Sequence, residues 1–297
     1  MRWSRRRFLA AAGAYAALTG CSAGGARPGG AAGREDEAVP TYHYGDHPAQ
    51  FAELSLPSGT SVVPVVVIVH GGFWRDAYGA ELGRPLARDL VNRGYAALNV
   101  EYRRVGPNAQ AGGGGWPTTC LDVAAAVDAL AEAGQRLAGG RLDLSRVVAL
   151  GHSAGGHLAG WLASRARQEA GAPGADPQVT LSGAVIQAGV VDLVGGYEAD
   201  LGGGAVRDFM GGSPHHLGDA YGQASPLARV PLGVPTVCVH GREDDVVPIG
   251  QSETFVAAAR EAGDTSELQA FDGDHSDVID TSHEGWQLCV EALERLL

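Results

Sequence analysis

The chain has 297 residues, of which 45% are hydrophobic and 19% charged, and this suits one large α/β domain with a sizeable buried core. The formal net charge is −12, and beyond residues 1–20, which hold four Arg and no acid, 18 basic residues face 34 acidic ones. A chain this acidic argues against nucleic acid as a partner.

Residues 1–20 have the layout of a signal peptide: a basic start, a short Ala-rich apolar run, then small residues. The apolar run Phe8–Leu18 has eleven residues. A membrane-spanning helix needs about 20, so this run is too short to serve as one. Ser4–Leu9 (SRRRFL) resembles the twin-arginine export signal of bacteria.

Leu18–Cys21 (LTGC) resembles a lipobox, in which Cys21 becomes the lipidated first residue after cleavage. The alternative is a plain secretory signal with an incidental Cys21. Residues 21–38 are small and polar without periodicity, which predicts a flexible tether. We therefore expect an exported protein, held by lipid at the extracytoplasmic face of the bacterial cell membrane or secreted.

Residues 39–297 alternate apolar, β-branched runs with stretches of helical spacing. The expected strands are Val62–Val69, Tyr95–Val100, Arg146–Leu150, Gly183–Ala188, Pro235–Val239 and Glu267–Phe271. The expected helices carry apolar stripes at Leu82–Leu90, Leu121–Leu130, Leu158–Leu162 and Trp286–Leu297. This alternation predicts an α/β fold with a mainly parallel central sheet and helices on both faces. Such sheets hold their sites at the carboxyl ends of the strands.

Residues 192–232 break this alternation. They are rich in Gly, His and Pro, with weak periodicity. We expect a small lid-like insertion over the strand ends. Loop aromatics are candidates either to line a pocket or to pack in the core: Trp74, Trp116, Tyr197, Phe209 and Tyr221.

Three cysteines follow Cys21, and their spacing matches no metal motif. They are Cys120, Cys238 and Cys289. An exported location permits one disulfide, but the sequence does not choose a pair. Cys238 lies inside an apolar strand, where a buried free thiol is the favoured interpretation.

The pentapeptide Gly151–Gly155 (GHSAG) has the form G-x-S-x-G between an expected strand and an expected helix. That is the context the motif requires, because a sharp turn must lift Ser153 Oγ out of the sheet. The helix from Ala154 onward points its N-terminus at the same place and favours an oxyanion there. The alternative is a Gly-rich turn in which Ser153 only caps the helix. We interpret Ser153 as the nucleophile.

A serine nucleophile needs a base and an orienting carboxylate, which follow in the order acid, then His, in this fold class. His275 comes directly after the last expected strand, and His283, nearer the final helix, is its competitor. Asp244 follows the strand before it and is the expected carboxylate by motif register, with Asp245 as the alternative. An acidic surface turn is the other interpretation of this segment.

The segment His70–Trp74 (HGGFW) follows the first long buried strand and resembles the H-G-G-type oxyanion loop of esterases. Its glycine pair lets the backbone turn its N–H groups inward. We expect the backbone N–H groups of Gly72, Phe73 and Ala154 to be the oxyanion donors. His70 is expected to brace this loop rather than to react.

The four motifs HGGFW, GHSAGG, HGREDDVVP and GDH, in this order, resemble the α/β-hydrolase superfamily. Within it the chain is similar to the esterase and hormone-sensitive-lipase-like branch, especially small acetyl or feruloyl esterases and kynurenine formamidase-like proteins. The resemblance covers roughly residues 40–297. Phe73 replaces the third Gly of the lipase-type loop, which favours the formamidase-like and feruloyl-type members. Glu101 stands where such proteins often have Asn.

The resemblance implies an exported serine hydrolase that cleaves small or carbohydrate-linked carboxylic esters through an acyl-enzyme, with no metal or organic cofactor. An amide hydrolase, arylformamidase-like or peptidase-like, is the first alternative, because the triad does not reveal the leaving group. A non-catalytic binding module on the same scaffold is the second. The acyl and alcohol groups of the substrate and the oligomeric state are not indicated.

Overall fold

The structure is a computed structural model that describes residues 39–297. The predicted signal peptide (1–20), the lipidation site Cys21 and the tether (21–38) lie outside the described residues. Across residues 39–297, no helix has both the length and the apolar character needed to cross a membrane.

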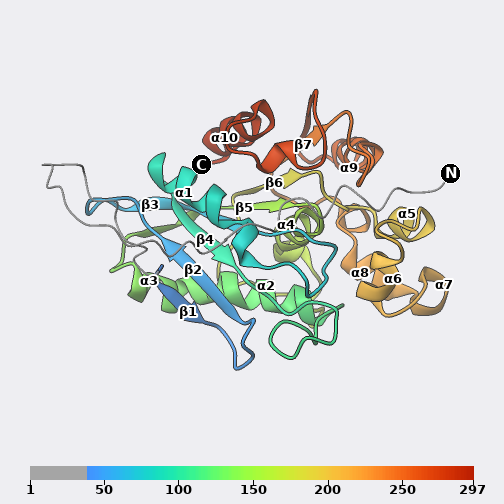
Figure 1. The fold of residues 1–297 in the computed structure, drawn as a ribbon, viewed down its shortest axis with the longest axis horizontal. Helices are drawn as coiled ribbons and strands as arrows, with labels where there is room; N and C mark the ends of the chain where they lie inside the picture. The colour runs from blue at the N-terminus through green and yellow to red at the C-terminus, as the bar shows by residue number, and fades with distance from the viewer. Residues whose placement is uncertain (1–38) are drawn as a thin grey trace, which may run out of the picture. The chain divides into compact units, whose positions relative to one another are not determined.

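A single sheet of eight strands runs through residues 39–297 in the order β1-β2-β4-β3-β5-β6-β7-β8 (Figure 1). The strands are β1 Thr41–His43, β2 Phe51–Ser55, β3 Val63–Val69, β4 Ala96–Val100, β5 Leu142–His152, β6 Gly183–Gln187, β7 Thr236–Gly241 and β8 Ser266–Phe271. β1 and β2 pair antiparallel, β2 also pairs antiparallel with β4, and every pairing from β4 to β8 is parallel. The predicted mainly parallel α/β sheet is confirmed.

Helices follow the strands along the chain. They are α1 Arg84–Asn92, α2 Thr118–Asp128, α3 Ala133–Leu137, α4 Ala154–Ser164, α5 Leu193–Glu198, α6 Ala205–Met210, α7 Pro214–Leu217, α8 Asp219–Ala224, α9 Gly250–Glu261 and α10 Glu284–Leu296. Short 3₁₀ turns are η1 Ala80–Leu82, η2 Ala129–Ala131, η3 Arg165–Arg167, η4 Leu227–Arg229 and η5 Asp277–Ile279.

The sheet is covered on both faces, and β3 shows how its sequence achieves this. Val65 and Val67 point to one face and pack in a cluster with buried residues of α2, α4 and α9. Val66 and Ile68 point to the other face and pack with buried residues of α1 and α10. Figure 1 shows α1 and α10 on one side of the sheet and α2 on the other. Each fully buried Val contributes about 1.5–3 kcal/mol, so a strand that buries valines on both faces contributes substantially to the stability of the fold.

The structure changes some expected boundaries and adds two strands. β5 begins at Leu142, four residues before the expected start, because Leu142 pairs with Val63 ahead of a register shift between Pro64 and Val65. β1 and β2 are not among the expected strands. β2 carries the buried Glu53, whose carboxylate accepts hydrogen bonds from side chains on α1 and β4, so its sequence lacks an apolar run.

The insertion of residues 192–232 lies between β6 and β7 and forms α5 to α8 and η4. Asp192 caps α5, because its carboxylate accepts the backbone N–H groups of Val194 and Gly195. These helices have four to six residues each, too short to leave a helical period in the sequence. Buried side chains, among them Phe209 and Tyr221, join the segment to the main core.

Candidate active site

The predicted site residues follow four parallel strands at one edge of the sheet. The loop of residues 70–76, called the oxyanion loop below, follows β3; Ser153 follows β5, Asp244 follows β7 and His275 follows β8. Carboxyl ends of parallel strands meet at one edge, so the topology gathers these segments.

Ser153 occupies a sharp turn between β5 and α4 with φ 57° and ψ −119°. This conformation is a genuine outlier for a residue with a side chain, and such strain clusters at functional sites. The flanking glycines are required by space, since a Cβ on Gly151 would lie 2.0 Å from Gly155 O and one on Gly155 would lie 2.0 Å from Val69 O. The Ser153 side chain makes no capping hydrogen bond to α4, so the helix-cap alternative has no support.

Asp244 and His275 are in direct contact. His275 Nδ1 lies 2.7 Å from Asp244 Oδ2, and the side chain of Asp244 is fully buried. Asp244 Oδ1 accepts the backbone N–H groups of Val246 and Val247 at 2.9 and 2.8 Å. Burial by itself raises the pKa of Asp244, but the hydrogen bonds from His240 and His275 outweigh it and hold the pKa well below its usual range. The carboxylate therefore stays ionised and fixes the orientation of the His275 ring.

The competing residues have other roles in the structure. Asp245 is exposed. His283 precedes α10 and caps it, because its Nδ1 accepts the backbone N–H of Gly285 at 3.1 Å. The geometry thus separates Asp244 and His275 from their neighbours in the sequence.

His152, the residue before Ser153, joins the serine turn to the His275 loop. Its Nε2–H donates to the backbone carbonyl of His275 at 2.9 Å, and the two rings lie 4.5 Å apart between centroids. Burial, together with the neighbouring His275 ring, lowers the pKa of His152 to about 3, so it remains a neutral donor. Within residues 39–297, Ser153 Oγ and His275 make no hydrogen bond with each other. The connection between these loops runs through His152, which the motif analysis did not single out.

His240 is a second histidine on the same carboxylate. Its Nε2 lies 3.1 Å from Asp244 Oδ2 and 2.9 Å from Val247 O, and its Nδ1 lies 2.8 Å from Ser252 Oγ. The ring is completely buried. Asp244 is thus held between two imidazoles. In the sequence, the only signal of the second contact is that His240 precedes Asp244 by four residues.

The oxyanion loop has a strained backbone beside the serine. Phe73 and Trp74 have φ of 53° and 54°, a conformation that costs non-glycine residues about 1–3 kcal/mol each. A Cβ on Gly71 would lie 3.1 Å from Ser153 Cβ, so this loop and the serine turn are in contact. Within residues 39–297, the backbone N–H groups predicted as donors make no hydrogen bond: Gly72, Phe73 and Ala154. They are therefore available to a substrate oxygen.

A buried cluster of charged and polar side chains, His70, Glu101 and Arg104, supports the start of this loop. His70 Nε2 lies 3.1 Å from Glu101 Oε1, and the His70 ring stacks on Tyr102 at 4.3 Å. Glu101 also accepts the backbone N–H of Ala80 and pairs with Arg104. Burial opposes the charge on Glu101, but its bond to His70 and the charges of His70 and Arg104 lower its pKa. His70 thus braces the loop as expected, and Glu101 holds the His70 ring through a hydrogen bond.

Trp74, inside the oxyanion loop, is anchored in the core. Its Nε1–H donates to His157 Nδ1 at 3.2 Å, so the Nε2–H of His157 donates to Ala224 O at 3.0 Å. Burial lowers the pKa of His157 to about 4, in agreement with a neutral ring. Trp74 also stacks on Phe209 at 4.5 Å. Both aromatics are buried, as is Tyr221, so these three pack in the core instead of lining a pocket.

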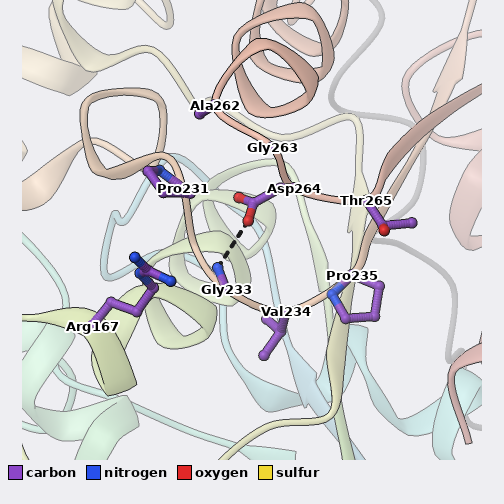
Figure 2. Close-up of a pocket in the computed structure, with 9 residues that line it drawn as sticks. All are labelled: Arg167, Pro231, Gly233, Val234, Pro235, Ala262, Gly263, Asp264 and Thr265. Carbon is purple, nitrogen blue, oxygen red and sulfur yellow. Dashed lines mark hydrogen bonds between the residues drawn. The ribbon is translucent and has the colours of Figure 1, made fainter.

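Two cavities differ in their relation to this edge. One of about 350 Å³ is drawn in Figure 2, where Gly233 N–H donates to the Asp264 carboxylate at 3.0 Å. Its lining segments precede β7 and β8, so it opens at the amino edge of the sheet, away from Ser153. A second cavity of about 300 Å³ lies between α5 and α9 and includes Pro248, four residues beyond Asp244. Neither lining includes Ser153, Asp244 or His275.

The described part of the chain has neither a candidate metal site nor a disulfide bond. Residues 39–297 contain no group of three or more His, Cys, Asp or Glu side chains able to hold a metal ion. Cys120, Cys238 and Cys289 are buried free thiols there.

Comparisons with known sequences agree with this geometry. The BD-FAE family profile matches residues 53–258, more than half of the chain. Esterase LipC of Mycobacterium tuberculosis is 31% identical over 235 residues, covering 73% of this chain and 54% of that protein. The probable isoprenylcysteine alpha-carbonyl methylesterase ICME of Oryza sativa subsp. japonica is 28% identical over 253 residues, covering 80% of this chain and 57% of its own length. The chain thus spans about half the length of these curated relatives.

Solved structures show the same fold. Esterase 2 of Thermogutta terrifontis, in a form phosphonylated by sarin, superposes with a TM-score of 0.70 at 21% identity and covers 89% of this chain and 95% of that one. A bifunctional GH43-CE protein of Bacteroides eggerthii has a TM-score of 0.69 at 21% identity and covers 86% of this chain and 35% of that one. The architecture described above is therefore that of the α/β-hydrolase fold.

Proposed function

The chain belongs to the BD-FAE family and has the α/β-hydrolase fold, and from this premise we propose that it is a serine hydrolase that cleaves carboxylic esters. One observation carries the proposal: the strained turn at Ser153 lies on the strand edge that also holds the buried Asp244–His275 pair. Strain of this kind persists only where the surrounding structure holds it, and it is common at nucleophiles.

In the proposed mechanism His275 is the general base. Its Nδ1–H donates to the ionised Asp244, which leaves Nε2 free to take the proton of Ser153 as Oγ attacks the ester carbonyl carbon. Asp244 stabilises the imidazolium that forms. His275 then returns the proton to the leaving alcohol, and an acyl group remains on Ser153. Water attacks that acyl-enzyme by the same route and releases the acid.

The proposed oxyanion hole consists of the backbone N–H groups of Gly72, Phe73 and Ala154. Their freedom from other partners within residues 39–297 and the contact of Gly71 with Ser153 support this assignment. A donor of this type typically lowers the barrier by about 3–4 kcal/mol, because it meets charge that develops only in the transition state. The loop keeps its donors fixed before substrate arrives, since hydrogen bonds anchor His70 at its start and Trp74 after the last donor, Phe73.

We favour ester cleavage over amide cleavage because the two similar proteins described above are esterases. LipC is an esterase and ICME a probable methylesterase. The discriminating experiment is a panel of p-nitrophenyl esters of rising acyl length, run beside a feruloyl ester and N-formylkynurenine. The proposal requires the ester substrates to give the highest kcat/KM, and faster turnover of N-formylkynurenine would make the enzyme an amide hydrolase.

A fluorophosphonate probe tests the nucleophile directly, since esterase 2 of Thermogutta terrifontis has been obtained phosphonylated by sarin. The wild-type protein is expected to label once, at Ser153, and Ser153→Ala to lose both labelling and turnover. Ser164→Ala is the matched control, because Ser164 is a buried serine at the other end of α4, where its hydroxyl donates to Trp161 O. Full esterase activity in Ser153→Ala would overturn the assignment.

We further propose that the enzyme works outside the cytoplasm, carried there by residues 1–20 and tethered through a lipid on Cys21. The basic start, the SRRRFL segment and the LTGC segment support this proposal. Cys21→Ala should move the mature protein from the membrane fraction to the soluble fraction of the cell envelope. Equal membrane association of this variant and the wild type would contradict lipidation.

A further inference from the structure

The insertion contacts the oxyanion loop through a turn of three glycines, residues 202–204. Arg75 Nη2 donates to Gly202 O at 2.7 Å and lies 3.4 Å from Gly203 O. The same guanidinium lies over the Phe73 ring, 5.8 Å from its centroid. Two side chains of the loop, those of Phe73 and Arg75, therefore contact one turn of the insertion.

The Phe73 ring rests directly on the backbone of Gly202. A Cβ built on Gly202 would lie 2.6 Å from both Cδ1 and Cε1 of Phe73, closer than real atoms approach. Gly203 has almost the same backbone conformation, with φ of 63° against 62°, but a Cβ there would meet nothing within 4 Å. The two glycines thus share their backbone requirement and differ in their contact with Phe73.

This contact falls where the loop most needs support. Phe73 and Trp74 have positive φ, and a backbone under such strain persists only when its surroundings hold it. The insertion supplies a second support through Phe209, which stacks on Trp74 and accepts the backbone N–H of Trp116 at 2.8 Å. The insertion therefore contacts both strained residues, one through Gly202 and one through Phe209.

We propose that Gly202 and Arg75 are positioning residues, which hold Phe73 so that its backbone N–H points to the oxygen of the tetrahedral intermediate. The inference rests on the proposed function, because it assigns the insertion a part in the same oxyanion hole. It follows that the insertion sets the strength of transition-state stabilisation as well as covering the strand ends. A misplacement of about 1 Å at such a group can cost about 10²-fold in rate.

The test compares Gly202→Ala with Gly203→Ala on one p-nitrophenyl ester. Both variants place a methyl group on a left-handed residue, so both bear the same backbone cost. Only Gly202→Ala displaces Phe73. We expect kcat to fall about 10-fold or more in Gly202→Ala with KM changed less than about 2-fold, because the oxyanion donor acts in the transition state. Gly203→Ala should keep the wild-type kcat.

Rescue separates positioning from general damage. Phe73→Ala keeps the backbone donor and removes the ring that a Gly202 methyl would strike. The double variant Gly202→Ala/Phe73→Ala should therefore have the same kcat as Phe73→Ala alone. If the substitution at Gly202 lowers kcat equally with and without the ring, the proposal is wrong.

A folding failure of Gly202→Ala leaves a second measurement. Arg75→Met keeps an unbranched side chain but removes the guanidinium, and with it the bond to Gly202 O and the contact over the Phe73 ring. It should lower kcat by about 3-fold or more, while its thermal midpoint falls no further than that of Gly203→Ala. Unchanged kcat in Arg75→Met, or equal kcat in the two glycine variants, overturns the inference. Ser153→Ala is measured in parallel, so that failure of the proposed function can be distinguished from failure of this inference. An active Ser153→Ala refutes the proposed function. An inactive Ser153→Ala, together with equal kcat in Gly202→Ala and Gly203→Ala, refutes only the positioning role of Gly202 and Arg75.

Discussion

The two edges of the parallel sheet differ in which residues hold left-handed backbone conformations. At the carboxyl edge, residues with side chains hold left-handed backbone conformations, and charged or polar groups are buried among them; they include Phe73, Trp74 and Ser153, with Glu101 and His240 beside them. At the amino edge, several left-handed positions fall on glycines with open space around them, among them Gly94, Gly140 and Gly263. That edge also has a buried ion pair, Arg165–Asp128, and one strained residue with a side chain, Asp176, but the strained residues beside the proposed site all lie at the carboxyl edge.

Strained residues with side chains gather at the edge of the sheet that holds the proposed site. Strain and buried polar groups each cost stability, so a fold retains them where something other than stability is selected. The cavity drawn in Figure 2 opens at the amino edge and has charged residues in its lining. The larger of the two cavities described above therefore lies away from the proposed site.

The largest expected effect compares two carboxylates that share one kind of contact. Asp244 at the carboxyl edge and Asp264 at the amino edge each accept two backbone N–H groups. Asp244→Asn should lower kcat by about 10⁴-fold, because the amide cannot hold His275 in the required tautomer. Asp264→Asn should keep the wild-type kcat. Steady-state kinetics on one p-nitrophenyl ester measures both, and a comparable loss in the two variants would erase the distinction between the edges.

A second comparison concerns stability and uses two glycines. Gly155→Ala places a Cβ 2.0 Å from Val69 O, between two main chains that cannot give way, and should cost about 3 kcal/mol or more in the free energy of unfolding. Gly263→Ala meets nothing within 4 Å and bears only the left-handed backbone cost of about 1–2 kcal/mol. Urea denaturation of both variants decides the point, and equal losses would show that the carboxyl edge is no tighter than the other.

The third prediction concerns acid. The pKa of His157 is lowered to about 4 from a usual value of 6.5, so between these values the unfolded chain binds a proton that the folded chain does not. Stability therefore falls as the pH falls, by about 1.4 kcal/mol per pH unit for this group from about 6.5 down to about 4. His152, with a pKa of about 3, adds a loss of the same sign that continues to lower pH.

The measurement is the unfolding free energy at pH 7 and pH 5. His157→Gln should be less stable than the wild type at pH 7 and should lose about 1–2 kcal/mol less between the two pH values. His216→Gln is the control, because His216 is exposed on α7 and away from the core. An unchanged pH dependence in His157→Gln would mean that the ring is not buried in its neutral form.

The sequence predicted the parallel sheet and the order of the motifs, because strand periodicity and turn residues are local properties. Asp244 and His275 lie in contact as the motif order indicated, although their catalytic roles stay predictions. The supporting contacts could not be predicted, since His152 meets His275 across 123 residues and His70 meets Glu101 across 31. Nothing in the residues near His152 signals such a partner.

The short elements escaped prediction for a related reason. The insertion helices and β1 have three to six residues, and their stability comes from tertiary packing rather than from an amphipathic period. The contact of Gly202 with Phe73 belongs to the same class, because only the folded chain shows which glycine of the three supports a ring.

The three buried thiols give the described part of the chain a property of practical use. Burial raises the pKa of Cys238 and of Cys289 to about 12 and raises that of Cys120 well above its usual value, so all three stay protonated and unreactive in the folded protein. Alkylating reagents reach them only when the core opens. Their rate of modification therefore measures how often the core opens. It reports the lifetime of the native state without the need for a substrate.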